Sequence, residues 1–354
     1  MEEKNELDAL REKLLYKQKQ GYDIIDVDER IKLEEYATAY KAYLNAARTE
    51  REAVTEAIAQ AEALGFVPYE RGMVLEPGTK IYKSVRGKAL MLAVMGRETL
   101  DHGANIAAAH VDSPRLDLKP IPLYEKDEIC LLKTHYYGGI KKYQWVAIPL
   151  EIHGVVTKKD GETIEVVIGK DPEDPKFTIT DLLPHLAKDQ MAKHGSDIIP
   201  GEYLNLLAGS VPYAGEGTKR VMLAVMSLLN DRYDITEEDF LSAELEVVPS
   251  FEACDIGVDR SFIGGYGQDD RVCAYAELKA IFSTPRRRTA PPCASLPTRK
   301  RSARWAFPAC RAVRLKRSWP TSASSRTCIC ATALRTASAS ARMCATPMTR
   351  RSGT

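Results

Sequence analysis

The sequence contains no run of eighteen apolar residues, which is about the length that a membrane-spanning helix needs, so we expect no membrane span. Its first residues, MEEKNELDALREKLL, are charged and lack the apolar core of a secretory signal peptide. The spacing Cys-x-x-Cys is absent, and only Cys328 and Cys330 lie close together. These absences predict a cytoplasmic chain whose eight cysteines are reduced thiols and not disulfides.

Acidic residues and histidine are missing from the C-terminal part of the chain. All 49 Asp and Glu lie within residues 1–277, whereas residues 278–354 hold 17 of the 50 Lys and Arg and five of the eight Cys. No histidine follows His194. A split of charge this sharp marks residues 285–354 as a basic tail that differs from the rest of the chain.

The remaining composition is that of a globular protein, with 44% hydrophobic and 28% charged residues in 354. Before residue 121, apolar spacing predicts helices and then short strands, which are Glu6–Lys17 and Glu34–Leu64 followed by Lys80–Val85, Ala89–Val94 and Asn105–His110. Gly65 stands where the second helix is expected to stop.

The middle of the chain is richer in strand patterns. Strands are predicted at Ile129–Thr134, Trp145–Val156, Glu162–Ile168 and Leu245–Ser250, with helices at Thr180–His194, Lys219–Leu229 and Asp269–Phe282. This order predicts an α/β fold in which one domain is interrupted by a second. We expect residues 1–120 and 251–284 to form the first domain, residues 121–250 to be an inserted β-rich domain, and residues 285–354 to be a disordered tail.

His110 and Asp112 are the first candidates for chemistry, because they close a predicted strand, where ligands collect in α/β sheets. An imidazole is a good zinc ligand, and a carboxylate two residues later can orient the ring. The triplet His-x-Asp alone is weak, since most such triplets are structural. The turn at Ser113-Pro114 strengthens the case.

Asp269 and Asp270 form a second candidate site, at a glycine-rich turn before a predicted helix. Adjacent carboxylates at such a position usually cap the free amides of the helix, and we expect this role for Asp269. A metal-binding role for Asp270 does not follow from spacing within the chain.

Several segments together resemble the aspartyl aminopeptidase family of binuclear zinc aminopeptidases, over about residues 20–285. The segment Ala109-His110-Val111-Asp112-Ser113-Pro114 and Leu118-Lys119-Pro120 is similar to the family's signature around its first zinc-binding histidine. Further matches are Tyr137-Gly138-Gly139, Trp145, Pro149-Leu150, Gly154-Val155-Val156, Leu183-Pro184-His185-Leu186 and Tyr266-Gly267-Gln268-Asp269-Asp270-Arg271.

The resemblance implies a zinc-exopeptidase α/β/α sandwich with an inserted dimerisation domain, and a role for each matched residue. His110 would bind one zinc, Asp112 would be the catalytic-site carboxylate that steers its ring, and Asp270 would bridge two zincs. His185 would reach a neighbouring subunit's substrate, although an ordinary surface role fits it equally well. In the family, the zinc pair activates a water that attacks the first peptide bond of a peptide.

The resemblance also exposes a gap. The family carries a Glu-Glu pair, a later Asp and a C-terminal His after the bridging Asp, and this chain has no Asp or Glu after Glu277 and no His after His194. The codons of Thr298–Ala303, read one base out of frame, permit Asp-Lys-Glu-Glu-Ile-Gly, and those of Arg342–Arg350 permit Asp-Val-Cys-Asn-Ala-Tyr-Asp-Pro. Both resemble the missing motifs in the right order, so we expect a frame break between Phe282 and Arg288 and a truncated catalytic domain.

Three functions remain open at this point. The leading one is a zinc aminopeptidase lineage that removes N-terminal, acidic residues from peptides, with this chain inactive, homo-oligomeric and free of nucleic acid and membrane. The alternative is a non-catalytic assembly protein acting through residues 121–250. The third, a nucleic-acid-binding protein that uses the basic tail, is least favoured because the tail has no repeat, few aromatics and no motif.

Overall fold

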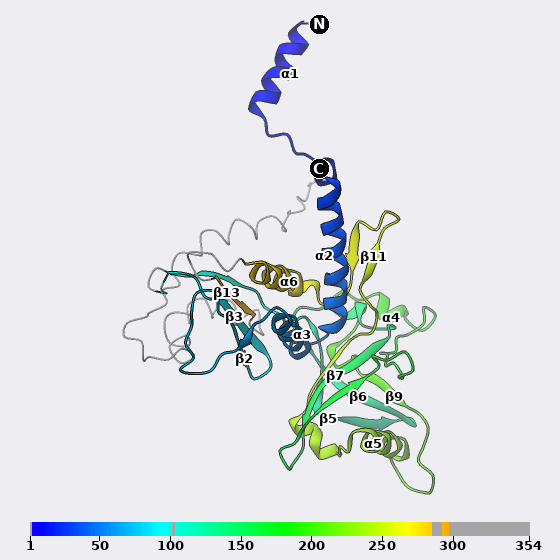
Figure 1. Ribbon diagram of the computed structural model, residues 1–354. Helices are drawn as coiled ribbons and strands as arrows, with labels where there is room; N and C mark the ends of the chain where they lie inside the picture. Colours follow the sequence, from blue (N-terminus) through cyan, green and yellow to red (C-terminus); the bar gives the residue numbers. More distant parts are fainter. Residues whose placement is uncertain (1, 99, 101–102, 285–291, 297–354) are drawn as a thin grey trace. The chain divides into compact units, whose positions relative to one another are not determined.

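A computed structural model describes residues 2–98, 100, 103–284 and 292–296 (Figure 1). The chain divides into two units, one of residues 1–42 and one that begins at Tyr43. The first unit contains α1 (Glu2–Leu14), the short 3₁₀ helix Gly21–Asp23 and most of α2 (Val27–Ala46). No helix in the part of the chain that the structure describes is long and apolar enough to cross a membrane.

The single long helix predicted at residues 34–64 is wrong, because the structure has two helices there. α2 ends at Ala46 and α3 spans Glu50–Ala63. Thr49 starts α3 through a capping box: the Glu52 amide donates to the Thr49 hydroxyl at 3.2 Å, and the Thr49 amide donates to the Glu52 carboxylate at 2.9 Å. These bonds satisfy amides that a continuous helix would have paired within itself. Gly65 ends α3 with a φ of +81°, as expected.

The first sheet has the order β1-β2-β3-β13-β4. Its strands are β1 (Val67–Pro68), β2 (Lys80–Val85), β3 (Ala89–Val94), β4 (Asn105–Ala108) and β13 (Pro292–Leu296). β2 and β3 form the predicted hairpin. Helices α3 and α6 (Gln268–Phe282) both pack on this sheet (Figure 1). The rings of Phe66 and Phe282 meet edge to face at 5.8 Å.

β13 corrects one expectation, since residues 285–354 were predicted to be disordered throughout. Residues 292–296 form a strand that pairs antiparallel with β3 and parallel with β4. Pairing on both sides gives the backbone polar groups of this strand their hydrogen-bond partners. The rest of the predicted tail lies outside the described residues.

The second sheet is antiparallel and has the order β8-β7-β10-β5-β6-β9. Its strands are β5 (Arg115–Lys126), β6 (Ile129–Tyr137), β7 (Leu150–Thr157), β8 (Thr163–Ile168), β9 (Leu206–Gly209) and β10 (Glu244–Pro249). β5 runs without a break through residues 120 and 121, where the sequence placed a domain limit. The domain limits themselves stay a prediction.

Helices in this part agree with the sequence only in part. α5 (Arg220–Tyr233) matches the predicted helix at residues 219–229. The helix predicted at Thr180–His194 is wrong, because only Lys188–Met191 is helical, as α4. Pro184 has no amide to donate and its ring obstructs the preceding turn, so the helix does not form across it. The strand predicted from Trp145 begins only at Leu150, after the 3₁₀ turn Lys142–Gln144 and Ala147, whose φ is +58°.

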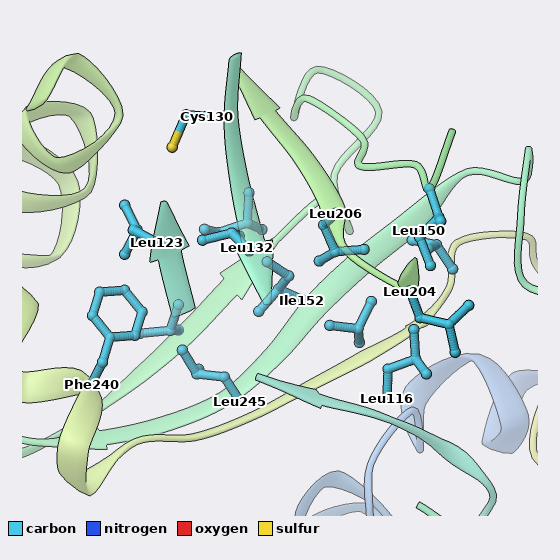
Figure 2. Close-up of a cluster of buried hydrophobic side chains, with 14 of the residues drawn as sticks. Leu116, Leu123, Cys130, Leu132, Leu150, Ile152, Leu204, Leu206, Phe240 and Leu245 are labelled. Atoms are coloured by element: carbon cyan, nitrogen blue, oxygen red, sulfur yellow. The ribbon is translucent and has the colours of Figure 1, made fainter. Parts of the chain in front are cut away.

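A hydrophobic core covers one face of the second sheet (Figure 2). Leu116, Leu132 and Ile152 come from β5, β6 and β7, and Phe240 comes from the 3₁₀ helix Glu237–Ser242. Burial of a side chain of this size stabilises the fold by about 1.5–3 kcal/mol. The core therefore holds β5 and β6, whose ends lie at the candidate site.

Buried charges, and not apolar side chains alone, join α3 to the second sheet. His153 of β7 lies between two carboxylates, with Nδ1 at 2.9 Å from Glu52 and Nε2 at 3.1 Å from Glu151. Burial opposes protonation of His153, but the hydrogen bonds and charges of the two carboxylates outweigh it and raise the pKa of His153. Arg48 pairs with Glu151 at 3.3 Å. Such pairs must be complete, because a buried charge left without its partner is costly.

Thr49→Ala should lower the free energy of unfolding by about 1 kcal/mol, because it removes the hydroxyl of the capping box. Chemical denaturation followed by circular dichroism measures the change. Thr55→Ala is the matched control, since Thr55 is exposed within α3 and the exchange there adds helix propensity. Equal midpoints for Thr49→Ala and the unaltered chain would contradict the assigned start of α3.

Candidate functional site

His110 lies just beyond the carboxyl end of β4, in the segment that leads into β5. The buried residues Ala109 and Val111, on either side of His110, fix this segment in the interior, and His110 itself is 6% exposed. The start of α6 approaches the same place and brings Asp269 and Asp270. The structure therefore joins the two segments that sequence analysis selected separately.

The two ring nitrogens of His110 have different partners. Nδ1 lies 3.1 Å from Oδ1 of Asp112 and 3.0 Å from its backbone oxygen. Nε2 lies 3.5 Å from Oδ1 of Asp269 and 3.6 Å from Oδ2 of Asp270. One nitrogen thus carries the bond that orients the ring, while the other faces a pair of carboxylates, which is the arrangement a metal-binding histidine needs.

These carboxylates also set the ionisation of His110. Burial opposes the charged ring, but the hydrogen bond and charge of Asp112, together with the charge of Asp270, outweigh it and raise the pKa of His110. Because the pKa is raised in the folded chain, protonation of His110 stabilises the fold at low pH. That contribution is lost as the pH rises through the folded-state pKa.

Further hydrogen bonds fix the segment that carries His110. The Tyr137 hydroxyl at the end of β6 donates to Oδ2 of Asp112 at 2.7 Å. The Ser113 hydroxyl donates to the Asp269 carbonyl at 2.7 Å, and the Tyr266 hydroxyl donates to the Pro114 carbonyl at 3.1 Å. The segment is therefore tied both to the second sheet and to the residues around the start of α6.

Asp269 differs from the sequence-based expectation of a helix cap. Gly267, with a φ of +87°, is the N-cap of α6, and neither Asp269 nor Asp270 has helical dihedral angles. The Asp269 carboxylate instead faces His110 at almost the same distance as that of Asp270. The adjacency of the two carboxylates is the sequence signal that could have placed both of them near His110.

Glu277 is a further carboxyl that sequence reasoning did not select. It lies on α6, two turns after Asp270, and burial followed by the charge of Asp270 raises its pKa to about 8, against the opposing effect of the Ala108 amide. Its Oε2 has no hydrogen-bond partner among the described residues. A carboxyl with this pKa is mostly protonated at neutral pH and carries little negative charge.

His185 is not part of this cluster. It is exposed, in the irregular segment before α4, and no hydrogen bond or ion pair joins it to the described residues around His110. Three leucines beside it, Leu182, Leu183 and Leu186, are each more than half exposed. The proposed contact of His185 with another subunit's substrate stays a prediction.

The described residues fit zinc only in part. Nε2 of His110 and the carboxylates of Asp269 and Asp270 are suitable donors, but zinc in proteins takes four ligands, or three and a water. No group of three or more His, Cys, Asp or Glu side chains in the described ranges is arranged to hold a metal ion. The donor set is therefore incomplete, and no catalytic step through zinc follows from these residues.

Comparisons with known proteins identify the family to which this chain is similar. The family described as Aminopeptidase I zinc metalloprotease (M18) matches residues 43–295. A probable M18 family aminopeptidase 1 of Clostridium acetobutylicum is 48% identical over 274 residues, which are 76% of this chain and 59% of that protein. The corresponding protein of Thermotoga maritima is 50% identical over 251 residues, 71% of this chain and 55% of that protein.

Solved structures give the same result. The crystal structure of an M18 family aminopeptidase from Thermotoga maritima matches with a TM-score of 0.78 and 42% identity, over 87% of this chain and 68% of that one. Aminopeptidase I of Borrelia burgdorferi matches with a TM-score of 0.73 and 35% identity, over 85% and 70% of the two chains. The α/β exopeptidase fold predicted from the sequence is thereby confirmed. The chain spans little more than half the length of the curated relatives it matches.

Asp112→Asn should lower the pKa of His110 in the zinc-free chain, because it removes a negative charge beside the ring. It should also weaken the pH dependence of stability, with the largest loss of unfolding free energy at pH below about 6.5, where the ring is charged in both states. An NMR titration of the histidine ring protons measures the pKa. Asp231→Asn, an exposed charge deletion on α5, is the control, and an unchanged His110 pKa in Asp112→Asn would refute the assigned pairing.

Proposed function

The chain belongs to the aminopeptidase I zinc metalloprotease (M18) family, and we propose that it represents a lineage of zinc aminopeptidases that remove N-terminal, acidic residues from peptides. The observation that carries the proposal is the pairing of His110 with its carboxylates. Nδ1 is held by Asp112 while Nε2 faces Asp269 and Asp270. We place the protein in the cytoplasm.

In this proposal His110 is a zinc ligand, Asp112 steers its ring, and Asp270 is the bridging carboxylate. Asp269 lies as close to Nε2 as Asp270 does. Exchange of each carboxylate for its amide would therefore show which of the two takes part in zinc binding. When bound, zinc would supply the Lewis acid for peptide hydrolysis. The chain's own described residues supply only the first part of that site.

We further propose that the 354-residue chain is inactive because its reading frame breaks between Phe282 and Arg288. The family match ends at residue 295, shortly after this point. Beyond it the chain contains no Asp, Glu or His, which are the residue types that a zinc peptidase needs for its remaining ligands and its general base. The out-of-frame codons permit a Glu-Glu motif, which accounts for the missing residues.

A corrected gene tests both parts of this proposal. One base is restored within the codons of residues 282–288, and release of an acidic N-terminal residue from a peptide is assayed with added zinc. The restored protein should be active, and the 354-residue chain should turn over at least about 10²–10⁴-fold more slowly, because the general base alone contributes about that factor. His110→Gln in the restored protein is the control and should abolish zinc-dependent turnover.

Three outcomes would each overturn a different part of the proposal. Robust turnover by the 354-residue chain would refute its inactivity. Failure of the restored, folded and zinc-loaded protein to cleave any aminoacyl substrate would refute the peptidase function itself. Cleavage restricted to neutral or basic N-terminal residues would overturn only the acidic preference.

A second candidate function is assembly through the inserted domain, and exposed apolar side chains favour it. Leu223 and Leu228 on α5 are 54% and 69% exposed, and Leu186 beside His185 is 68% exposed. A yeast protein of the same fold, 16% identical with a TM-score of 0.56, is described as a dodecamer. We propose that this chain forms homo-oligomers through the second sheet and its helices.

Light scattering of the full chain measures its oligomeric state. An oligomer that dissociates in Leu223→Glu/Leu228→Glu supports assembly through α5, because a carboxylate at a buried interface is strongly unfavourable. Glu216→Gln, an exposed change ahead of α5, is the control. A monomeric chain at micromolar concentration, with native circular dichroism, would reject this function.

A further inference from the structure

Tyr137 stands between a buried ion cluster and the histidine of the candidate site. In the ladder of β5 and β6, Tyr137 is directly opposite Arg115. Side chains in such positions contact one another across the strands, and the Arg115 guanidinium lies 4.5 Å from the centroid of the Tyr137 ring. The strand register therefore fixes the tyrosine against the arginine.

The arginine is itself firmly held. Arg115 is 10% exposed at its side chain, and its guanidinium lies 2.8 Å from Asp117, 3.0 Å from Glu246 and 3.4 Å from Glu50. These carboxylates come from β5, β10 and α3. A planar guanidinium with several carboxylate partners has little freedom to rotate, so it provides a rigid surface for the tyrosine ring.

A glycine allows β6 to end close to the segment that bears His110. Gly138 has a φ of +77°, and a Cβ there would lie 3.3 Å from Cα of Pro114. A side chain at this position would crowd Pro114 and would have to adopt a backbone conformation that favours glycine. This close approach brings the Tyr137 hydroxyl within reach of Asp112.

The hydroxyl completes the bonding of Asp112. It donates to Oδ2 at 2.7 Å, while Oδ1 faces Nδ1 of His110 at 3.1 Å. Because each oxygen has its own partner, the carboxylate cannot rotate without breaking one of the two bonds. A fixed carboxylate favours the His110 tautomer with hydrogen on Nδ1, which leaves the lone pair of Nε2 directed at Asp269 and Asp270.

We propose that Tyr137 is a positioning residue for His110: stacked on Arg115, it fixes Asp112 and so selects the ring tautomer that can bind a metal through Nε2. The proposal rests on the proposed function for the use made of Nε2, but the positioning is a property of the metal-free chain. Through Tyr137, the site at the end of β4 is connected to Arg115 and to the carboxylates that join α3 and the second sheet.

The test is a nitrogen-15 NMR measurement of the histidine rings in the zinc-free 354-residue chain, at a pH where the rings are neutral. His110→Gln identifies the His110 signals among the six histidines. Tyr137→Phe removes the hydroxyl and keeps the ring on Arg115. It should raise the ratio of the Nε2-H to the Nδ1-H tautomer roughly 2- to 10-fold, the effect expected for one hydrogen bond.

Two further variants bracket this result. Asp112→Asn should shift the tautomer ratio at least as far as Tyr137→Phe, because it removes the carboxylate that accepts from Nδ1. Tyr136→Phe is the matched control. Tyr136 precedes Tyr137 on β6, so its side chain points to the opposite face of the sheet. This variant should leave the tautomer ratio unchanged. Thermal unfolding of each variant verifies that it is folded.

Identical His110 signals in Tyr137→Phe and the unaltered chain would overturn the proposal, as would an equal shift in Tyr136→Phe. A Tyr137→Phe chain that does not fold would assign the hydroxyl a structural role in place of a positioning one. These readings do not depend on peptidase activity. An inactive frame-restored enzyme would remove the proposed function and still leave the tautomer ratio as a valid measurement.

Discussion

The buried guanidinium of Arg115 is the constraint on which the rest of the structure depends. It gathers carboxylates from α3, β5 and β10, so the first sheet's helix layer and the second sheet meet at one ion cluster. Burial raises the pKa of Glu246 well above its usual range. The charge of Glu50 raises this pKa further, while the charge of Arg115 lowers it. The direction of this shift reflects the excess of negative charge that three carboxylates place around one buried cation.

The candidate site lies beside the ion cluster of Arg115, through the contact of Arg115 with Tyr137. His110 follows β4, Tyr137 ends β6, and the two aspartates lie at the start of α6. Elements of both sheets therefore meet around one imidazole. The site is nevertheless incomplete in the described residues, since zinc needs more donors than His110 and its neighbouring carboxylates provide. The reading-frame break that we propose would leave such a partly formed site, because only the early part of the gene would be in frame.

Local patterns in the sequence predicted much of the fold. The β2–β3 hairpin, most strands of the second sheet, and α5 and α6 agree with apolar spacing and turn residues. The errors have local causes: the capping box at Thr49 divides one predicted helix, and Pro184 prevents another. β13 was missed because its pairing between β3 and β4 is a tertiary contact that no local pattern reveals.

The site was predictable in its residue types but not in its geometry. His110, Asp112 and Asp270 were selected from motifs, and the structure brings them together, whereas Asp269 was assigned a capping role because its contact with His110 depends on the fold. Tyr137 was noted only as part of a family match, since its bond to Asp112 follows from strand register. The most direct test of the account is the nucleotide sequence across the codons of residues 282–288. The account predicts one missing base or two extra bases there, and unambiguous reads with an intact frame would contradict it.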